Sequence, residues 1–380
     1  MSLSKKLRVA ILFGGKSAEH EVSLQSAKNV LNAIDKSRFE PVLIGIDKQG
    51  AWRLNDATHL LADSDNPQLF ALNKPHAELS LLPGTNSDQI VAINSTRTIG
   101  NIDVVFPVLH GPYGEDGSMQ GLLKLMNIPF VGSGVLGSAL GMDKIVMKKL
   151  LRDAAIPIAR FLSFSDHQKD KIHFQEIIQQ LGLPVFIKPA NLGSSVGISK
   201  VKDESEFRTA IDEAFNYDRK ILIEETIDGR EIECAVLGNE NPMASVPGEV
   251  ICNSHTDGFY SYEAKYIDEN GAVLEIPANL TKTEQLNIQE LAIKSYETLC
   301  CEGMARVDFF LKPNGELVVN ELNTIPGFTS ISMYPKLWEA TGKSYSELIS
   351  DLIDLALQRY EAEKKLKTSV TLFSGSITDI

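Results

Sequence analysis

Two carboxylates in the C-terminal third of the chain are spaced so that they could bind a metal ion together. Strand-like runs flank Asn314-Gly315, a dipeptide typical of a two-residue hairpin turn. Such a turn places Asp308 opposite Glu321 and Arg306 opposite Asn323. Because side chains alternate between the two faces of a strand, these four polar residues share one face of the hairpin. Their types and spacing therefore predict one chemically active face.

The other face of this hairpin is predicted to be core. It carries the apolar residues Ala305, Val307, Phe309, Leu311, Val318 and Leu322. Two carboxylates directly opposite each other, with Cβ atoms about 5 Å apart, repel, so we expect a cation between them. Asp308, Glu321 and the Asn323 amide, without His or Cys, suit Mg²⁺, which takes its remaining ligands from phosphates and water. A solvated hairpin with scattered charges is the alternative, and it explains the apolar face but not the polar cluster.

Composition and charge are those of an ordinary globular protein. The 380 residues are 43% hydrophobic and 23% charged, enough for two or three domains with buried cores. The net charge of −13, without a block of Lys and Arg, argues against nucleic acid or an acidic membrane as partner. We expect no signal peptide and no membrane-spanning segment. The four cysteines have neither metal-binding spacing nor a disulfide framework, so buried thiols in a reducing cytoplasm are expected.

The elements that must position the hairpin begin with a βαβ unit. Residues 7–15 form a buried strand pattern ending in a glycine turn, 22–34 have helical apolar spacing, and 39–47 are a second strand pattern. This order predicts an open parallel α/β sheet with ligands at the carboxyl ends of its strands. The sequence GGKS is not a Walker loop, because Ala10 stands where that motif needs glycine. Residues 55–100 are polar and weakly periodic, and we interpret them as an insertion.

Candidate polar residues follow the strands of this sheet. Glu19 falls in the loop or first helical turn after the first strand, where a favourable contact with the helix dipole is the alternative to a binding role. Residues 101–123 predict a strand, a turn-rich loop with His110, Glu115 and Asp116, and a helix. For His110, a structural role and a functional role in that loop both remain open.

Lysines on two later elements indicate an anionic ligand. Asp143 is predicted to cap the helix at 143–156. Lys144 in its first turn opposes the helix dipole, so either a nearby anion or solvent compensates its charge. Lys188 lies on an otherwise apolar strand, where an unpaired ammonium is costly.

The loop NLGSSVG after that strand predicts a phosphate-binding lid. Gly193 and Gly197 allow backbone N–H groups to wrap around phosphates, and Ser194 and Ser195 supply hydroxyls. Glycine and serine also form ordinary hairpins, so this motif alone is only moderately specific.

Three acidic residues and an aromatic segment complete the candidates. Glu224, Glu225 and Glu231 lie near the ends of two predicted strands, with solvent exposure as the alternative for each. The segment GFYSYEAKYID, which contains Tyr266, is polar enough to form a loop and aromatic enough to cover a ligand.

Taken in this order, the motifs resemble the ATP-grasp superfamily, and within it the D-alanine:D-alanine ligases of bacterial peptidoglycan synthesis. The matching pieces, which span nearly the whole chain, are GGKSAEHEVSLQSA, HGPYGEDGSMQG, GMDK, FIKPANLGSSVG, YEAKY and ARVDFF...NELNTIPGFTS. The resemblance implies an N-terminal open parallel α/β sheet followed by a two-part ATP-grasp fold, α+β in the C-terminal part. It divides the chain into an N-terminal domain at 1–132, a central domain at 133–224, a C-terminal domain at 225–366, and a tail at 367–380.

The activity that this resemblance implies is the ATP-dependent joining of two D-alanine molecules in the cytoplasm. ATP would phosphorylate the carboxylate of one D-alanine, and the amine of the second would displace phosphate. Such phosphoryl transfer needs charge neutralisation and positioning more than covalent help from the protein. The resemblance also implies two Mg²⁺ ions, with Mn²⁺ as a possible substitute, and a homodimer.

The resemblance further assigns roles to individual residues. Asp308, Glu321 and Asn323 match the metal ligands, Lys144 and Lys188 the phosphate lysines, Ser195 the lid, Glu224 and Glu225 the adenine hinge, Glu231 the ribose contact, and Arg306 with the backbone N–H of Gly327 the oxyanion donors. On the amino-acid side, Glu19 and Ser332 match groups that hold the ammonium of the first D-alanine, His110 lies near its carboxylate, and Ser194 and Tyr266 link the lid to Glu19.

Two departures and two rival functions accompany the resemblance. Glu225 stands where some relatives carry lysine, and residues 55–100 extend beyond the shorter members. A ligase that makes D-alanine:D-lactate or D-alanine:D-serine is one rival, and a non-catalytic nucleotide or amino-acid sensor is the other. The complete set of charged residues argues against the sensor, because binding alone does not need both metal carboxylates and an oxyanion arginine.

Overall fold

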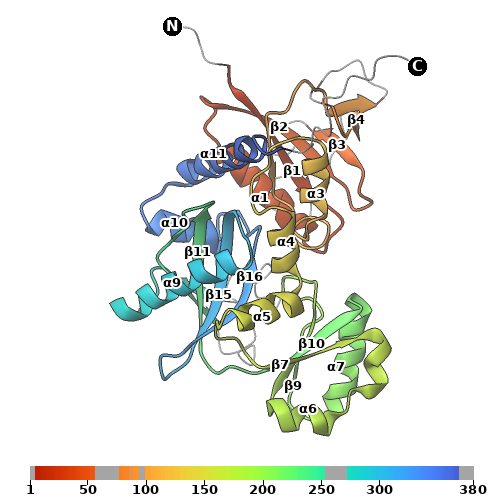
Figure 1. Cartoon of the computed structure of the whole chain (residues 1–380), viewed down its shortest axis with the longest axis vertical. Helices are drawn as coiled ribbons and strands as arrows, with labels where there is room; N and C mark the ends of the chain where they lie inside the picture. The colour runs from red at the N-terminus through yellow and green to blue at the C-terminus, as the bar shows by residue number, and fades with distance from the viewer. Residues whose placement is uncertain (1–4, 56–76, 86, 94–98, 253–271, 368–380) are drawn as a thin grey trace, which may run out of the picture.

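The computed structural model describes residues 5–55, 77–85, 87–93, 99–252 and 272–367. Their strands form three sheets, which follow one another along the chain (Figure 1). None of the described helices is long and apolar enough to span a membrane. The predicted tail, apart from Lys367, lies outside the described residues.

The N-terminal sheet has the strand order β5-β4-β3-β2-β1-β6. β1 (Leu7–Gly14) pairs in parallel with β2 (Phe39–Ile46) on one side and with β6 (Val104–Pro107) on the other. Helix α1 (His20–Ala33) connects β1 to β2 and packs on the sheet. The predicted βαβ unit is therefore confirmed.

The remaining strands of this sheet pair antiparallel, which corrects the prediction of an open parallel sheet. β3 (Trp52–Asn55), β4 (Ala77–Leu81) and β5 (Ile90–Ile93) continue from β2 in antiparallel pairs. Residues 55–100, interpreted as an insertion, contain β4 and β5 of this sheet. Most side chains of these three strands are only half-buried, which weakens the apolar pattern that identifies a strand.

The C-terminal helices pack back onto the N-terminal sheet. α10 (Met333–Ala340) and α11 (Tyr345–Glu363) contribute buried residues to the same apolar cluster as β1 and α1. Figure 1 shows α11, in blue, beside the red N-terminal strands. The first and last thirds of the chain therefore share a core, and α3 (Ser118–Leu125) and α4 (Val135–Met142) lead from the N-terminal sheet to the rest.

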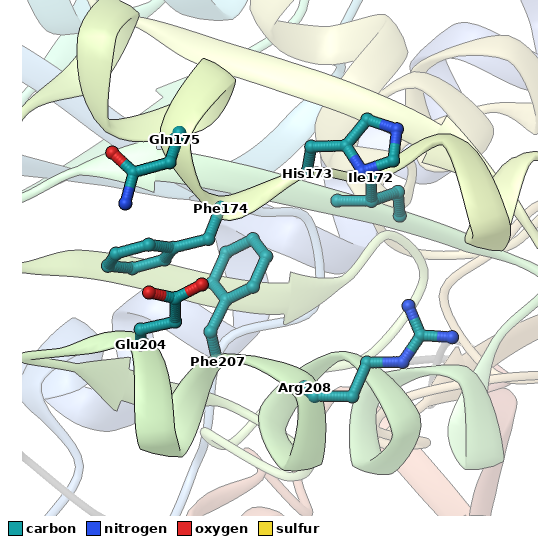
Figure 2. A pocket seen from close by; sticks show the side chains of 7 residues that line it. All are labelled: Ile172, His173, Phe174, Gln175, Glu204, Phe207 and Arg208. Carbon is teal, nitrogen blue, oxygen red and sulfur yellow. The ribbon is translucent and has the colours of Figure 1, made fainter.

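The central sheet is small and antiparallel. Its order is β7 (Phe161–Ser165), β10 (Lys220–Glu225), β8 (Val185–Pro189) and β9 (Ser199–Val201). The short 3₁₀ helix η2 (Asp166–Lys171) follows β7, and α6 (Phe174–Leu181) and α7 (Glu204–Tyr217) share an apolar cluster with the strands. Figure 2 shows a hollow at the first turns of α6 and α7, and none of the predicted site residues lines it.

The C-terminal sheet carries the predicted hairpin. Its order is β14 (Ala272–Glu275), β13 (Gly248–Cys252), β11 (Arg230–Gly238), β15 (Gly303–Leu311) and β16 (Leu317–Asn323), and the short β12 (Met243–Ala244) pairs with β11. Helices α5 (Lys144–Asp153) and α9 (Lys282–Thr298) join these strands in one apolar cluster.

The described cysteines are free thiols that differ in exposure. Cys234 and Cys301 are buried as expected, and burial raises the pKa of each to about 12. Cys300 is exposed, so the expectation of buried thiols is wrong there. The side chain of Cys252 lies outside the described residues.

Candidate active site

The β15–β16 hairpin brings its polar residues together in the predicted pairs. Arg306 lies opposite Asn323, and Asp308 lies opposite Glu321. All four are partly buried, and they alternate on β15 with fully buried neighbours. The pattern of alternation therefore predicted the polar face of the hairpin correctly.

The turn of this hairpin differs from the prediction. The backbone N–H of Lys312 donates to the carbonyl oxygen of Glu316 at 2.9 Å, so the loop is 313–315 rather than two residues long. Gly315 has a φ of 82°, which a residue with a side chain seldom adopts. The predicted two-residue turn is wrong by one residue.

A bulge in the strand pairing compensates for the longer loop. The register shifts between Asp308 and Phe309, so that Phe309 pairs with Val319 and Asn320 is the extra residue. Val319 therefore takes the place predicted for Val318 in the apolar cluster, although Val318 is buried as well. Because loop and bulge each shift the register by one residue, their effects cancel where the carboxylates face each other.

Arg306 lies between two carboxylates on neighbouring strands. Its Nε and Nη2 donate to the two oxygens of Asp308, each at 2.7 Å, and Nε lies 2.9 Å from Oε2 of Glu233. The Asn323 amide donates to Asp308 Oδ2 at 2.9 Å. Burial by itself would lower the pKa of Arg306, but Asp308 and Glu233 hold it well above its ordinary value. The guanidinium therefore stays charged and fixed in direction.

The second carboxylate of the hairpin is neutralised from another element. Lys144 begins α5, where the Asp143 side chain accepts from two backbone N–H groups as predicted. The Lys144 ammonium lies 3.2 Å from Oε2 of Glu321 and donates to the Leu192 carbonyl oxygen at 2.7 Å. Of the two alternatives left open for Lys144, the nearby anion is thus found in part at the hairpin, and the contact with Leu192 joins this lysine to the predicted lid.

Glu224 is buried between two lysines. Nζ of Lys188 donates to Oε2 of Glu224 at 2.7 Å, and the ammonium of Lys148 contacts the other oxygen. Burial alone would raise the pKa of Glu224, but Lys148 and Lys188 hold it below its usual value. The pKa of Lys188 is raised by Glu224 against the effect of burial, whereas burial lowers the pKa of Lys148.

The other two predicted nucleotide contacts lie on the adjoining strands. Glu225 ends β10, and its carboxylate binds Arg160 through Nε and Nη2 at 2.7 and 2.6 Å. Its backbone N–H donates to the Arg160 carbonyl oxygen. Glu231 lies on β11 opposite Phe310 and raises the pKa of Lys188. The Glu225 side chain therefore forms an ion pair with Arg160. Glu231 instead acts electrostatically on Lys188.

The predicted lid loop contacts the N-terminal sheet. Ser194 donates through its hydroxyl to Oε1 of Glu19, which is buried at the start of α1. Ser194 and Ser195 both have left-handed backbone angles, with φ of 52° and 60°. The loop from 191 to 198 is half-buried and forms turns. Glu19 and the lid, far apart in sequence, thus meet at one place.

His110 is buried and held by hydrogen bonds at both ring nitrogens. Nδ1 lies 3.0 Å from the Ile325 carbonyl oxygen, and Nε2 lies 3.3 Å from the Ser26 hydroxyl. The Ile325 backbone N–H donates to Glu115 at 3.3 Å. Burial lowers the pKa of His110, so it is neutral at pH 7. These contacts favour the structural side of the two roles left open for His110.

Glu115 is a titratable group that the motif analysis named without a role. Burial first and the nearby Glu19 second raise its pKa to about 8. Its other oxygen accepts the Gly111 backbone N–H at 2.8 Å. Glu115 thus connects the loop after β6 to the loop after β16.

Gly327 and Ser332 lie in that same loop after β16. A Cβ on Gly327 would lie 2.7 Å from the Ser332 hydroxyl, so no larger residue fits without displacing it. The Ser332 hydroxyl accepts the Thr329 backbone N–H at 2.9 Å and lies 2.8 Å from its hydroxyl. Tyr266 and the rest of the aromatic segment lie outside the described residues.

Sequence reasoning missed Lys148 and Glu233. Lys148 follows Lys144 by one helical turn, and Glu233 follows Glu231 by two positions on a strand. These spacings put each on the same face as its predicted neighbour. These spacings are visible in the sequence. The sequence does not show, however, which neighbouring element that face of the helix or strand points towards.

The chemistry of the hairpin suits a hard divalent cation. Asp308 and Glu321 present carboxylate oxygens from facing positions, and Asn323 adds an amide. No group of three or more His, Cys, Asp or Glu side chains suited to a metal occurs among the described residues. The donor set therefore fits Mg²⁺, which needs few protein ligands when phosphates supply the rest.

Known proteins are similar to this chain over nearly its whole length. The family models described as D-ala D-ala ligase N-terminus and D-ala D-ala ligase C-terminus match residues 8–133 and 150–354. A D-alanine--D-alanine ligase of Shouchella clausii is 58% identical over 96% of this chain and 98% of its own. D-alanine--D-alanine ligase A of Escherichia coli K12 is 53% identical over 96% of this chain and 100% of its own.

Solved structures are similar over the same extent. The D-alanine-D-alanine ligase from Coxiella burnetii aligns with a TM-score of 0.84 at 38% identity, covering 95% of this chain and 97% of that one. The VanG D-Ala:D-Ser ligase from Enterococcus faecalis aligns with a TM-score of 0.81, also at 38% identity, over 93% of this chain and 100% of that one.

Proposed function

Because the chain belongs to the family of D-alanine:D-alanine ligases, we propose that its site joins two D-alanine molecules and converts ATP to ADP and phosphate. The observation that carries this conclusion is the pair of facing carboxylates, Asp308 and Glu321, each held by a cation, Arg306 and Lys144. The lid loop reaches the same place through Leu192. The product serves peptidoglycan precursor synthesis, and the proposal includes a cytoplasmic location.

The reaction needs an activated carboxylate, because a carboxylate is a poor electrophile. A carboxylate oxygen of the first D-alanine attacks the γ-phosphorus of ATP, and the bond from that phosphorus to the β-phosphate oxygen breaks. The amine of the second D-alanine then attacks the acyl carbon of the acyl phosphate. Phosphate leaves with the bonding electrons, and the amine loses a proton as the amide forms.

Metal ligation is the first role we assign to the chain. Asp308, Glu321 and Asn323 would hold two Mg²⁺ ions, or Mn²⁺ in their place, which neutralise phosphate charge when bound. Glu321, which contacts Lys144 in this structure, would be a metal ligand, and the Lys144 ammonium would bind a phosphate. Asp308 keeps its direction because Arg306 and Asn323 hold it.

Nucleotide and oxyanion contacts form the second part of the proposal. Lys144, Lys188 and the lid hydroxyl of Ser195 would bind phosphates. Glu224 and Glu225 would form the adenine hinge through the β10 backbone, and Glu231 would bind the ribose. Arg306 and the backbone N–H of Gly327 would stabilise the oxyanion of the tetrahedral intermediate, where fixed donors are most effective.

Amino-acid contacts form the third part. Glu19 would bind the ammonium of the first D-alanine, with Ser332 beside it. His110 would act near its carboxylate by holding the Ile325 carbonyl, and so the loop that carries Gly327. Ser194 would couple the lid to Glu19, together with Tyr266.

Several architectural features belong to the proposal as well. The central and C-terminal sheets would form the two halves of an ATP-grasp fold, with domains at 1–132, 133–224 and 225–366 and a tail at 367–380. A homodimer is proposed from the family resemblance. Leu125 and Leu136, on the neighbouring helices α3 and α4, are exposed apolar side chains of the kind that an interface covers.

Phosphate release tests the proposed substrate. With ATP and Mg²⁺ we expect release only when D-alanine is present, and D-alanyl-D-alanine as the product by mass spectrometry. A panel of D-serine and D-lactate as second substrate separates this function from that of the similar VanG D-Ala:D-Ser ligase. Hydrolysis independent of D-alanine, or a dominant D-serine or D-lactate product, would contradict the proposal, and nucleotide binding without turnover would favour a sensor.

Limited proteolysis tests whether the loop at 191–198 closes as a lid. We expect cleavage there to be faster in the free enzyme and slower with ATP, Mg²⁺ and D-alanine together, because glycines leave the loop few contacts of its own. Ser194→Ala is the matched variant, since it removes the contact with Glu19 and should reduce the protection. Cleavage at the same rate with and without all three ligands would rule out closure.

A further inference from the structure

Lys148 is a buried cation without a role in the scheme above. Its side chain lies on α5 one turn after Lys144 and is only 1% exposed. Its ammonium contacts one oxygen of Glu224 and donates to the Asn320 carbonyl oxygen at 3.1 Å. Burying a charged ammonium is costly unless it is paired, so its place beside Glu224 calls for a reason.

The carboxylate of Glu224 is shared between two lysines. Lys148 occupies one oxygen, and Lys188 donates to the other at 2.7 Å. Glu224 is itself only 3% exposed, so water does little to screen this group. Two cations and one carboxylate leave the buried cluster with an excess of one positive charge, in a chain whose net charge is −13.

Two further acids act on this cluster. Glu321 acts electrostatically on both Lys148 and Lys188 and also forms an ion pair with Lys144. Glu231 acts on Lys188 in the same way and is proposed as the ribose contact. A phosphate group arriving at Lys188 therefore meets a lysine whose own carboxylate partner already has a second counter-charge.

We propose that Lys148 is a positioning residue that neutralises Glu224, which leaves the charge of Lys188 for a nucleotide phosphate. This inference rests on the proposed phosphate role of Lys188. Without Lys148, Glu224 and Lys188 form a neutral ion pair, and the phosphate must compete with Glu224 for the Lys188 ammonium. With Lys148 present, Glu224 still fixes the direction of the Lys188 side chain. The positive charge of Lys188 is then not cancelled by Glu224, because Lys148 already neutralises that carboxylate.

The contact with Asn320 connects this cluster to the metal hairpin. Asn320 is the extra residue of the β16 bulge and immediately precedes Glu321. Because Lys148 donates to its carbonyl oxygen, one side chain joins β10 of the central sheet to β16 of the C-terminal sheet. These contacts therefore fix the position of Lys188, the proposed phosphate lysine, relative to Glu321, the proposed metal ligand.

A change in the charge of this cluster tests whether Lys148 balances charge or has a purely structural role. Lys148→Met keeps the length and apolar stem but removes the charge, and the Kd of Mg²⁺ with a non-hydrolysable ATP analogue should rise about tenfold or more, equivalent to ~1.4 kcal/mol. The double variant Lys148→Met with Glu224→Gln restores the excess of one positive charge. Its Kd should lie within about threefold of that of Glu224→Gln alone, because Lys148 has no carboxylate to neutralise once Glu224 is replaced, and the two changes are coupled through one contact. KM for ATP should follow Kd, with a smaller change in kcat for D-alanine ligation.

Three results would overturn the inference. An unchanged Kd in Lys148→Met, or a double variant as weak as the single one, removes charge balancing as the role of Lys148. If Lys148→Met does not fold in a thermal melt, a folded double variant that binds more than about tenfold more weakly than Glu224→Gln alone has the same consequence. Lys188→Met is measured alongside: wild-type binding there refutes the phosphate role of Lys188, and so the premise, whereas weak binding there leaves the Lys148 result to decide the inference alone.

Discussion

Asp308→Asn should abolish ATP turnover with D-alanine while leaving the protein folded. The substitution removes a metal carboxylate, so the charge on the phosphates is no longer compensated at the hairpin. Arg306 keeps Glu233 as a partner at 2.9 Å, and asparagine keeps the shape of the side chain. We therefore expect a thermal melt close to wild type, and the loss to fall on kcat.

A Mg²⁺ titration followed by thermal melting separates metal binding from folding. Mg²⁺ with ATP should stabilise wild type, since a ligand that binds only the folded state raises its stability, and should stabilise Asp308→Asn much less. Glu321→Gln should behave in the same way, although its lost partner is Lys144. Lys312→Gln is a matched control, because it disrupts an ion pair with Glu316 at the turn of the same hairpin. Wild-type turnover of Asp308→Asn at ordinary Mg²⁺ would refute the metal assignment.

Arg306→Ala should lower kcat by about 10²- to 10³-fold, the usual cost of removing one oxyanion donor from a site shielded from water. It also leaves Asp308 and Glu233 without the cation between them. Breaking a buried ion pair in this way costs about 3 kcal/mol or more of folding stability. The measurement is kcat at saturating substrates, at a temperature well below the melt of the variant.

Arg306→Lys is the control that separates charge from geometry. Lysine retains the positive charge but lacks the planar fork that binds both oxygens of Asp308. It should recover most of the stability and only part of kcat. If Arg306→Ala, folded and saturated, retains more than about a third of wild-type kcat, Arg306 has no part in oxyanion stabilisation.

Local rules predicted the polar face of the hairpin, but not the length of its turn or the bulge in its strand pairing. Alternation along β15 put Arg306 and Asp308 on one face, because that period is a property of the strand itself. The turn was predicted as two residues and is the loop 313–315. The bulge at Asn320 corrects the register, and no local signal marked that residue as unpaired.

The edge strands of the N-terminal sheet show where such rules become weak. β4 and β5 lie within the residues interpreted as an insertion, and they pair antiparallel at the edge of the sheet. Strands that bury few side chains need little apolar sequence. Whether such a segment forms a strand depends on the neighbouring strand with which it pairs. The local sequence pattern does not identify that neighbour.

The sequence by itself determined which polar residues share one face of a strand or one turn of a helix, and which element carries each of them. The Asp143 cap, the βαβ unit and the facing of Asp308 and Glu321 depend on neighbours within a turn, a strand or a hairpin. Only the tertiary structure decided that Lys148 and Lys188 share Glu224, and the contact of Ser194 with Glu19 was expected from the family resemblance rather than from any local rule. Those contacts join separate elements, and the side-chain directions follow from the packing of whole sheets and helices rather than from any local period.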